Sequence, residues 1–385
     1  MTVAQQRNFR RSLLKQIARR SAVPNCGEIA TGLILREKER YLGSHAVQSS
    51  TLYDLWTTDN GDEEAERRWA SAQQRPVLPL NYRRFRSLLV TYFHKARSTE
   101  GVRKICRFGD VEKMWHRIAR DLIVAQHQPR PHIGDWVDRG RDRQIDQIRS
   151  VLTSSRQAVV CADVTRAFAS VNIDAVYDLP YLPEPLTRRV IDYRSHRFIR
   201  RDRSEYAREL AHAVRNEDLV YDGVYDGVLE RSPSGLMEGS PASNAIFSVL
   251  LDDLPDHLEE GIQAFVYCDN IVLIAPSMSR ALRAKDDLVR YFTGHRAGPF
   301  EIRSSVARVS ERFEHLGYTL RRLPGLPPDV GIARNGWLKL VVRLLDEPRD
   351  VGEAAKWLKA SYGRCYYSSL REFLQVVNGA QPRSD

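Results

Sequence analysis

The sequence predicts an α+β fold, because helical segments alternate with short apolar runs that are typical of strands. Residues 1–70 have a helical and basic character, whereas 159–164 and 263–275 are the apolar runs. Each apolar run carries a carboxylate, Asp163 at a strand end and Asp269 in a tight turn. A carboxylate in such surroundings costs free energy unless a partner compensates its charge, so these two aspartates are the first functional candidates.

The composition indicates a folded protein with two or three lobes. The chain has 385 residues, of which 42% are hydrophobic, enough for a sizeable core. Its 59 Lys and Arg against 49 Asp and Glu leave a formal net charge of +10, which suits a polyanion such as nucleic acid. No apolar run approaches the roughly 20 residues of a membrane span. The five scattered cysteines form no CxxC pair, which favours a reducing cytoplasm over a disulfide framework or a structural zinc site.

The other segments can be interpreted in chain order. The first acidic residue, Glu28, is preceded by six Arg and Lys residues, which we interpret as a basic helix that contacts nucleic acid. The prolines in 74–79 predict a linker, and 186–215 predicts a long, strongly basic helix. Two Tyr-Asp-Gly turns in 221–227 predict a small hairpin, and 351–377 is a further helical segment.

Asp163 and Asp269 predict a magnesium site if their strands are neighbours in one sheet. Carboxylate oxygens are ligands that Mg²⁺ prefers, although a capped strand end would also explain Asp163 alone. Two metal ions roughly 3.5–4 Å apart can activate an attacking hydroxyl and stabilise a leaving pyrophosphate. Between the two aspartates, 235–244 carries two glycines around a short turn and then an apolar helix. Such a loop allows a base pair to approach closely, although an ordinary turn before a core helix is the alternative.

Three segments, in this order, resemble the motifs of reverse transcriptases. Residues 163–171 (DVTRAFASV) resemble the first catalytic motif, D-x-x-x-x-F-x-S-[IV]. Residues 235–244 (GLMEGSPASN) are similar to G-L-P-Q-G-S-P-x-S, and 267–270 (YCDN) to Y-x-D-D. Downstream, 313–318 (FEHLGY) resembles F-x-x-L-G-[YF], and upstream Lys95 with 103–105 resembles the fingers pattern P-K…R-P-[IL]. The resemblance spans about 90–320, with a weaker thumb-like match at 357–367.

This resemblance implies a right-hand polymerase with fingers, a palm of antiparallel sheet packed on helices, and a short helical thumb. Residues 1–75 would be a basic N-terminal helical extension and 76–157 the fingers. The palm would comprise 158–322, with a helical insertion on the finger side at about 186–230. A thumb-like region would follow at 323–385.

The resemblance also implies a role for each matching residue. Asp163 and Asp269 would hold two Mg²⁺ ions, with Mn²⁺ as a substitute, together with the backbone carbonyl of Val164. Phe168 would exclude a 2′-hydroxyl, which implies dNTPs as substrates and a DNA product. The expected contacts with the nucleotide come from Lys95, Arg103, Glu238 and Gly239, and those with template or primer from Gly235, Ser240, Pro241, Tyr267, Gly317 and Tyr318.

The sequence departs from the family pattern at several positions. Asn270 replaces the second aspartate of Y-x-D-D, which removes one negative charge although the amide oxygen can still coordinate a metal. Glu238 replaces the usual glutamine and Met237 the preceding proline. Arg303 stands where the family often has a lysine credited with protonating pyrophosphate. Arginine keeps the electrostatic contribution but is a poor acid, since its pKa exceeds about 12. Together with Asp163 and Asp269, Asn270 and Arg303 form the expected catalytic set. The replaced residues are compatible with a slow or specialised polymerase.

The resemblance is to stand-alone bacterial reverse transcriptases of the antiphage-defence type, with a palm like those of group II intron and retron enzymes. No integrase, RNase H or protease region is recognisable, and the retron signatures N-A-x-x-H and V-T-G are absent. The expected partners are an RNA template, the DNA product and dNTPs. A non-coding RNA and a companion protein or second reverse transcriptase would dock on the N-terminal 70 residues. The sequence leaves open whether the chain forms a homo-oligomer, and no membrane partner is expected.

The favoured function is therefore RNA-directed DNA synthesis, in which dNTPs are added to a 3′-hydroxyl by two-metal catalysis. A palm that only binds nucleic acid or a sister polymerase is one alternative, with Asn270 and Arg303 as marks of lost catalysis. A template-independent nucleotidyl transferase is another, and Glu238 favours it. The retained Asp163, Asp269 and Phe168 favour the polymerase over the binding module.

Overall fold

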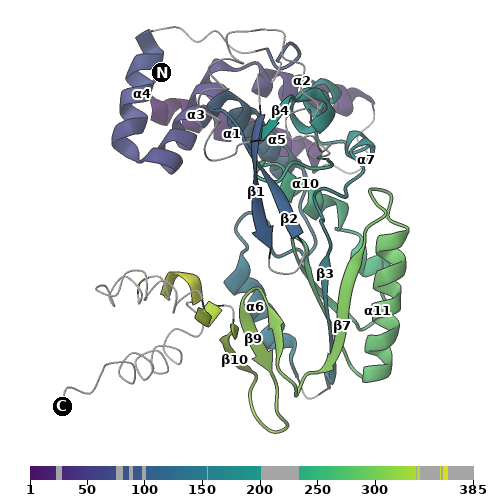
Figure 1. Cartoon of the computed structure of the whole chain (residues 1–385). Coiled ribbons are helices and arrows are strands. Elements are labelled where there is room, and N and C mark those ends of the chain that lie inside the picture. The colour runs from purple at the N-terminus through teal and green to yellow at the C-terminus, as the bar shows by residue number, and fades with distance from the viewer. Residues whose placement is uncertain are drawn as a thin grey trace, which may run out of the picture. The chain divides into compact units, whose positions relative to one another are not determined.

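The computed structural model describes residues 1–22, 28–74, 81–85, 90–97, 101–153, 155–200, 234–334, 336–338, 356 and 359–362. Their elements confirm the mixed α+β class, with antiparallel sheets packed against helices (Figure 1). The chain divides into two compact units. Unit 1 comprises Met1–Gln128, Arg166–Leu250 and His295–Pro299, and unit 2 comprises Pro129–Thr165, Leu251–Gly294 and Phe300–Asp385. The predicted palm, 158–322, contributes residues to both units.

Unit 1 begins with the helices that the sequence predicts for the N-terminal region. They are α1 (Val3–Ser21), α2 (Glu28–Leu42), α3 (His45–Asn60) and α4 (Asp62–Gln74), and α1 and α3 pack on α5 (Asp110–Gln126). Thr2 and Gln5 form a capping box at the start of α1, and the Ser44 side chain caps α3. Each cap satisfies backbone N–H groups that the first helical turn leaves without partners.

Partly buried ion pairs join three of these helices. The Arg10 guanidinium on α1 donates to Asp54 on α3 at 2.8 Å and to Asp121 on α5 at 2.7 Å. Arg7 also pairs with Asp54. Two of the six N-terminal cations are thus part of the helix packing, whereas the side chains of Arg11 and Lys15 are exposed on the outer face of α1.

The strands of unit 1 form a hairpin with a third strand beside it. β1 (Val90–Arg97) and β2 (Gly101–Arg107) are antiparallel, and β4 (Phe198–Arg200) pairs with β1 in parallel. An apolar cluster forms at this sheet from the side chains of Val90, Tyr92, Cys106, Phe108, Phe198 and Met237. Unit 1 also contains α7 (Asp174–Tyr177) and α10 (Ser243–Leu250), and α10 contacts α5.

The long helix predicted for 186–215 is wrong over its described part. The chain instead forms short pieces: α8 (Glu184–Leu186), the π-helix η1 (Thr187–Ile191), the 3₁₀-helix η2 (Tyr193–Ser195) and β4. Asp192 has an extended backbone, with ψ of 109°, and its carboxylate accepts the Arg194 N–H, so it ends one piece and caps the next. Phe198 is then buried in the apolar cluster beside β1, and tertiary packing outweighs helical propensity. Residues 201–233, which include the rest of this prediction and the 221–227 hairpin, lie outside the described residues.

Unit 2 is built around a four-stranded antiparallel sheet with the order β5-β6-β3-β7. The strands are β3 (Ala158–Val164), β5 (Gln263–Tyr267), β6 (Asn270–Ala275) and β7 (Ile302–Arg308). The strand expected to end near Asp163 and the two strands expected around 268–269 are thereby confirmed. The outer edge of β5 is covered by 132–134, which exchanges backbone hydrogen bonds with Val266 at 2.7 and 2.8 Å.

Each face of this sheet has its own cover. Side chains alternate between the two faces along a strand. One face, with Val159 and Cys161, packs on α6 (Arg141–Val151) and on a second sheet of β8 (Phe313–His315), β9 (Tyr318–Arg321) and β10 (Asp329–Ile332). The other face packs on α11 (Met278–Thr293), which lies along β3, β6 and β7 (Figure 1). The short 3₁₀-helix η3 (Leu254–His257) contacts α11.

Two regions complete the description. Of the predicted thumb-like region, 323–385, the structure describes residues up to 338 with one gap, Lys356 and 359–362, and the remainder lies outside the described residues. Of the predicted linker, 74–79, Gln74 is the last residue of α4 and the other residues lie outside the described part of the chain. Among the described helices, none is both long and apolar enough to cross a membrane.

Candidate active site

Four of the predicted residues form one row across the central sheet of unit 2. Asp163 on β3 is paired with Asn270 on β6 and, on its other side, with Arg303 on β7. Asn270 is in turn paired with Tyr267 on β5. Residues directly opposite one another in antiparallel strands project to the same face of the sheet. The row therefore places the side chains of Tyr267, Asn270, Asp163 and Arg303 on one face, at the end of the sheet where β3 finishes.

Asp269 lies beside this row, in the two-residue loop between β5 and β6. The other loop residue, Cys268, has a left-handed backbone with φ of 52°, a conformation that costs a non-glycine residue about 1–2 kcal/mol. The backbone carbonyl of Asp269 accepts the N–H of Val164 at 2.9 Å, which fixes the loop against the end of β3. Two carboxylates that are 106 residues apart in the chain thus meet at one end of one sheet.

The Asn270 amide is part of this arrangement. Its Nδ2 donates a 2.8 Å hydrogen bond to Oδ1 of Asp269. Because Asn270 also lies opposite Asp163 in the sheet, a third carboxylate at this position would face two others. The amide replaces that repulsion by a hydrogen bond and leaves its oxygen for another donor or a cation.

The thiol of Cys268 joins the hairpin to a distant segment of the chain. Sγ of Cys268 donates to Oδ2 of Asp135 at 3.0 Å. Burial raises the pKa of the Tyr267 hydroxyl, and the nearby Cys268 and Asp135 raise it further, so this phenol stays neutral. Asp135 is a residue that the sequence analysis missed, because nothing in its local pattern relates it to a hairpin 133 positions away.

The carboxylates of Asp163 and Asp269 fit magnesium in type and number. Mg²⁺ is commonly held by one or two carboxylates, with the remaining positions taken by water and substrate phosphates. Asp163 and Asp269, both half-buried, supply two carboxylates. Within the described part of the chain, no group of three or more His, Cys, Asp or Glu side chains could hold a metal ion. Two carboxylates alone would leave the other positions around a magnesium ion to water or to a ligand.

The glycine-containing segment 235–244 lies in unit 1, where two close approaches explain its glycines. Gly235 has φ of +64°, and a Cβ there would stand 2.3 Å from the carbonyl oxygen of Phe168. Gly239 has φ of +97°, and its Cβ would stand 2.4 Å from the carbonyl oxygen of Cys106 on β2. Both backbones can approach so closely only without a side chain.

Backbone hydrogen bonds hold this segment in the same two places. The N–H of Leu236 donates to the Phe168 carbonyl at 2.8 Å, and the N–H of Cys106 donates to the Glu238 carbonyl at 2.8 Å. The segment thereby links the end of the first motif to the β1–β2 hairpin. Met237, in place of the family's proline, is buried in the apolar cluster at that hairpin.

Ser240 is held by a histidine that the sequence analysis did not single out. The Ser240 hydroxyl lies 2.8 Å from Nδ1 of His116 on α5, and both residues are buried. Burial lowers the pKa of His116 well below its ordinary value, and the nearby His196 lowers it further. A neutral imidazole can accept the Ser240 proton in a hydrogen bond. The 124 residues between the two side chains hide this pair from any local sequence pattern.

The remaining predicted residues take positions in one unit or the other. Lys95 and Arg103 are opposite one another in the β1–β2 register. Phe168 is buried against Phe247, with ring centroids 5.5 Å apart. Pro241, half-buried, follows Ser240.

The predicted primer-contact residues Gly317 and Tyr318 lie in unit 2. Tyr318 is fully buried, donates to Asp142 at 2.7 Å and packs against Tyr362, whose hydroxyl stands 3.1 Å from the position of a Cβ on Gly317. Their described contacts are those of core packing, and their contact with a primer stays a prediction.

Comparison with known proteins adds no family to this description. No protein-family model matches the sequence, and no curated protein matches it.

Proposed function

We propose that the chain is an RNA-directed DNA polymerase, which adds dNTPs to a 3′-hydroxyl. The observation that carries the proposal is the row on the central sheet of unit 2. It brings Asp163 and Asn270 together from motifs more than a hundred residues apart. The backbone of Asp269 is hydrogen-bonded to Val164 at the end of β3. An isolated strand cap or an ordinary hairpin would not need both carboxylates at the same sheet end.

In this proposal, Asp163 and Asp269 hold magnesium. Bound there, Mg²⁺ ions would activate the attacking hydroxyl and stabilise the leaving pyrophosphate. Asn270 orients Asp269 through the 2.8 Å hydrogen bond and limits the negative charge of the site. Arg303, a permanent cation on the neighbouring strand, contributes attraction for phosphate oxygens but transfers no proton.

The residues of unit 1 have complementary roles in the proposal. Lys95 and Arg103, opposite one another in the hairpin, neutralise the triphosphate of the incoming nucleotide. Phe168 selects deoxynucleotides by excluding a 2′-hydroxyl. Gly235 and Gly239 allow the 235–244 segment to lie close to its neighbours, and Glu238 adds a negative charge near the nucleotide that the usual glutamine lacks.

We further propose that the enzyme is of the stand-alone, defence-associated type and works with a non-coding RNA or a companion protein. The net charge of +10 and the exposed Arg11 and Lys15 on α1 support a nucleic-acid partner. This step is an analogy with the resembled family.

One observation favours a second candidate, a palm that binds nucleic acid without catalysis. Arg303 lies directly opposite Asp163, so a guanidinium is placed where it can compete with a cation for that carboxylate. Together with Asn270, this arrangement lowers the net negative charge of the row. A binding module would retain RNA affinity but would not respond to magnesium.

The test of the proposal is primer extension by the purified full chain with labelled dNTPs and Mg²⁺ or Mn²⁺. Asp163→Asn and Asp269→Asn should each lower extension at least a hundredfold, because each removes one of two carboxylates. Asp286→Asn, an exposed carboxylate on α11, is the matched control and should leave extension unchanged. Extension that survives in both variants would contradict the proposal, and absence of extension with RNA still bound would favour the binding module.

A further inference from the structure

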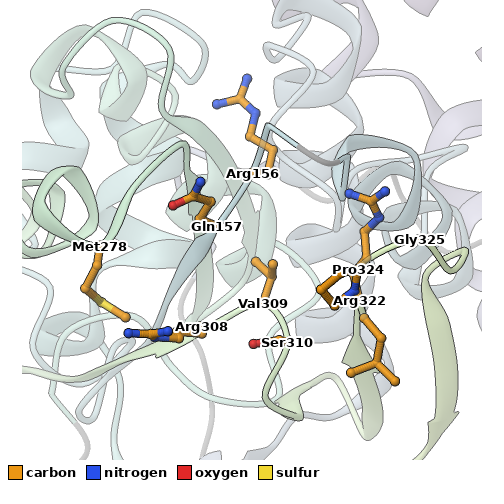
Figure 2. A pocket seen from close by; sticks show the side chains of 10 residues that line it. Arg156, Gln157, Met278, Arg308, Val309, Ser310, Arg322, Pro324 and Gly325 are labelled. Carbon is orange, nitrogen blue, oxygen red and sulfur yellow. The ribbon is translucent and has the colours of Figure 1, made fainter.

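A pocket of about 450 Å³ lies in unit 2, at the end of the central sheet opposite to Asp163 and Asp269. Its wall includes three arginines and several apolar side chains: Arg156, Arg308, Arg322, Met278, Val309 and Pro324. Figure 2 shows Arg308 beside Met278 on one side, Arg322 and Pro324 on the other, and Val309 between them. A volume of several hundred Å³ is typical of sites for small ligands.

Backbone hydrogen bonds connect the segments that form the wall. The N–H of Gln157 donates to Ala275, and the N–H of Val309 donates to Gln157 at 3.0 Å. The N–H of Arg322 then donates to the Val309 carbonyl at 2.6 Å. These hydrogen bonds connect the start of β3 with the ends of β7 and β9, so the pocket is preformed.

The charge of the wall is positive. No acidic side chain is among its lining residues. The Arg156 guanidinium donates to the backbone carbonyl of Gly261, which orients it without neutralising it. Among the described residues, no carboxylate forms an ion pair with Arg308 or Arg322. These two cations therefore remain available to an anion from opposite sides of the pocket.

The start of α11 adds to the positive electrostatic potential of the pocket. Met278 is its first residue, and the first turn contains no acidic side chain. The Ser277 side chain accepts the N–H of Arg280, while the N–H groups of the first helical residues have no partner within the helix. The positive end of a 16-residue helix thus lies at the same pocket as the arginines.

We propose that this pocket binds the phosphate groups of a nucleotide. Guanidinium groups form charge-assisted, bidentate hydrogen bonds with phosphate. The apolar surface of Met278, Val309 and Pro324 suits the sugar or base attached to the phosphate, which a purely ionic cleft would not favour. The nucleotide is either free in solution or part of a polynucleotide chain.

The pocket is separate from the candidate active site. Arg308 is paired with Ala158 and Arg303 with Asp163, so the two places are five positions apart along β3, about 17 Å at the rise of a strand. Arg308 and Arg303 also project to opposite faces of the sheet. The proposal therefore goes beyond the polymerase function and does not depend on it.

The test measures binding of two fluorescent probes to the full chain in EDTA, which removes metal-dependent binding at Asp163 and Asp269. The probes are an N-methylanthraniloyl derivative of ATP and a labelled single-stranded RNA of twelve nucleotides. The double variant Arg308→Gln/Arg322→Gln should weaken binding of at least one probe tenfold or more, because two charge-assisted contacts are lost. An effect on the ATP probe alone identifies a free nucleotide as the ligand, and an effect on RNA identifies a polynucleotide.

The control is Arg283→Gln, which removes an exposed arginine of α11 outside the pocket and should change either affinity less than twofold. The variant Arg308→Lys/Arg322→Lys keeps both positive charges and shows whether the glutamine variant loses affinity through loss of charge or through misfolding. It should retain more affinity than the glutamine variant. Hydrogen exchange should also show ligand protection at 309–310 and 322–325. Unchanged affinity for both probes in the double variant, or an equal loss in Arg283→Gln, would overturn the proposal.

Discussion

Asn270 donates a 2.8 Å hydrogen bond to the carboxylate of Asp269 and lies opposite Asp163 in the sheet. The same side chain therefore contacts one carboxylate of the candidate metal site and neighbours the other. An aspartate at this position would add a third negative charge to the pair. The asparagine thus favours a stable metal-free site at the expense of cation affinity.

Replacing Asn270 by aspartate tests this balance. In EDTA, Asn270→Asp should lower the free energy of unfolding by about 1 kcal/mol, because like charges face one another. Added Mg²⁺ should stabilise the variant more than the wild type, and primer extension should rise many-fold. Thermal unfolding with and without Mg²⁺, together with initial extension rates, measures both effects. Loss of extension in the variant would instead mean that the asparagine is integral to a rearranged site.

Gly239→Ala tests the close approach of the 235–244 segment to β2. The new Cβ would stand 2.4 Å from the Cys106 carbonyl oxygen at a φ of +97°, so the segment must move or lose the Cys106–Glu238 hydrogen bond. We expect destabilisation by about 2–4 kcal/mol in urea unfolding. Gly61→Ala is the matched control, since its φ is +84° and nothing lies within 4 Å of its Cβ. Equal losses in the two variants would show that backbone strain alone accounts for the effect.

Arg10 and Arg11 are neighbours in sequence with different expected roles. Arg10→Ala should lower the free energy of unfolding by about 2–4 kcal/mol, because Asp54 and Asp121 lose a shared cation. Arg11→Ala removes an exposed charge and should change stability by less than about 0.5 kcal/mol. If α1 binds RNA, Arg11→Ala should still weaken RNA binding in a filter assay at low salt. A large stability loss in Arg11→Ala would contradict this division of roles.

Buried histidines predict a loss of stability in mild acid. Burial lowers the pKa of His196 to about 4, whereas the unfolded chain protonates this residue near its ordinary pKa of about 6.5. The unfolded state therefore binds more protons below pH 6.5, and stability falls as the pH drops from 6.5 toward 4. For His196 alone the loss is about 2 kcal/mol at pH 5.

His196→Gln should remove that part of the pH dependence, because its amide can still donate to the Val190 carbonyl without titrating. His257→Asn, which replaces a half-exposed histidine, is the control and should leave the slope unchanged. Urea unfolding at pH 7.5 and pH 5 measures both. An unchanged slope in His196→Gln would mean that other groups carry the acid sensitivity.

The sequence predicts three of the four strands of the central sheet, β3, β5 and β6, because their signals are local, but it predicts no strand at β7. The apolar run before Asp163 and the two runs around Asp269 have the length of strands, and the turn between them contains few residues. The register that brings Tyr267, Asn270, Asp163 and Arg303 into one row is not local. It depends on pairings across more than a hundred residues, which a single sequence does not specify.

Tertiary packing also accounts for the main error in the predicted fold. The segment that follows Pro185 has a helical sequence pattern, but Phe198 gains more by packing beside Tyr92 and Cys106 in a strand next to β1. His116 and Asp135 were missed for a related reason. Each contacts a residue of a predicted motif, Ser240 or Cys268, from a distant segment, and a lone histidine or aspartate carries no signal of its partner.

The central claim is tested most directly by the sequence of the product made in the presence of a defined template. Purified chain, nuclease-treated to remove bound nucleic acid, would be given an RNA template with an annealed primer, the same primer alone, and dNTPs with Mg²⁺, and any product would be sequenced. The account predicts DNA complementary to the RNA, made from dNTPs in preference to rNTPs and lost in Asp163→Asn. Product of template-independent sequence, or no product while RNA still binds, would contradict it.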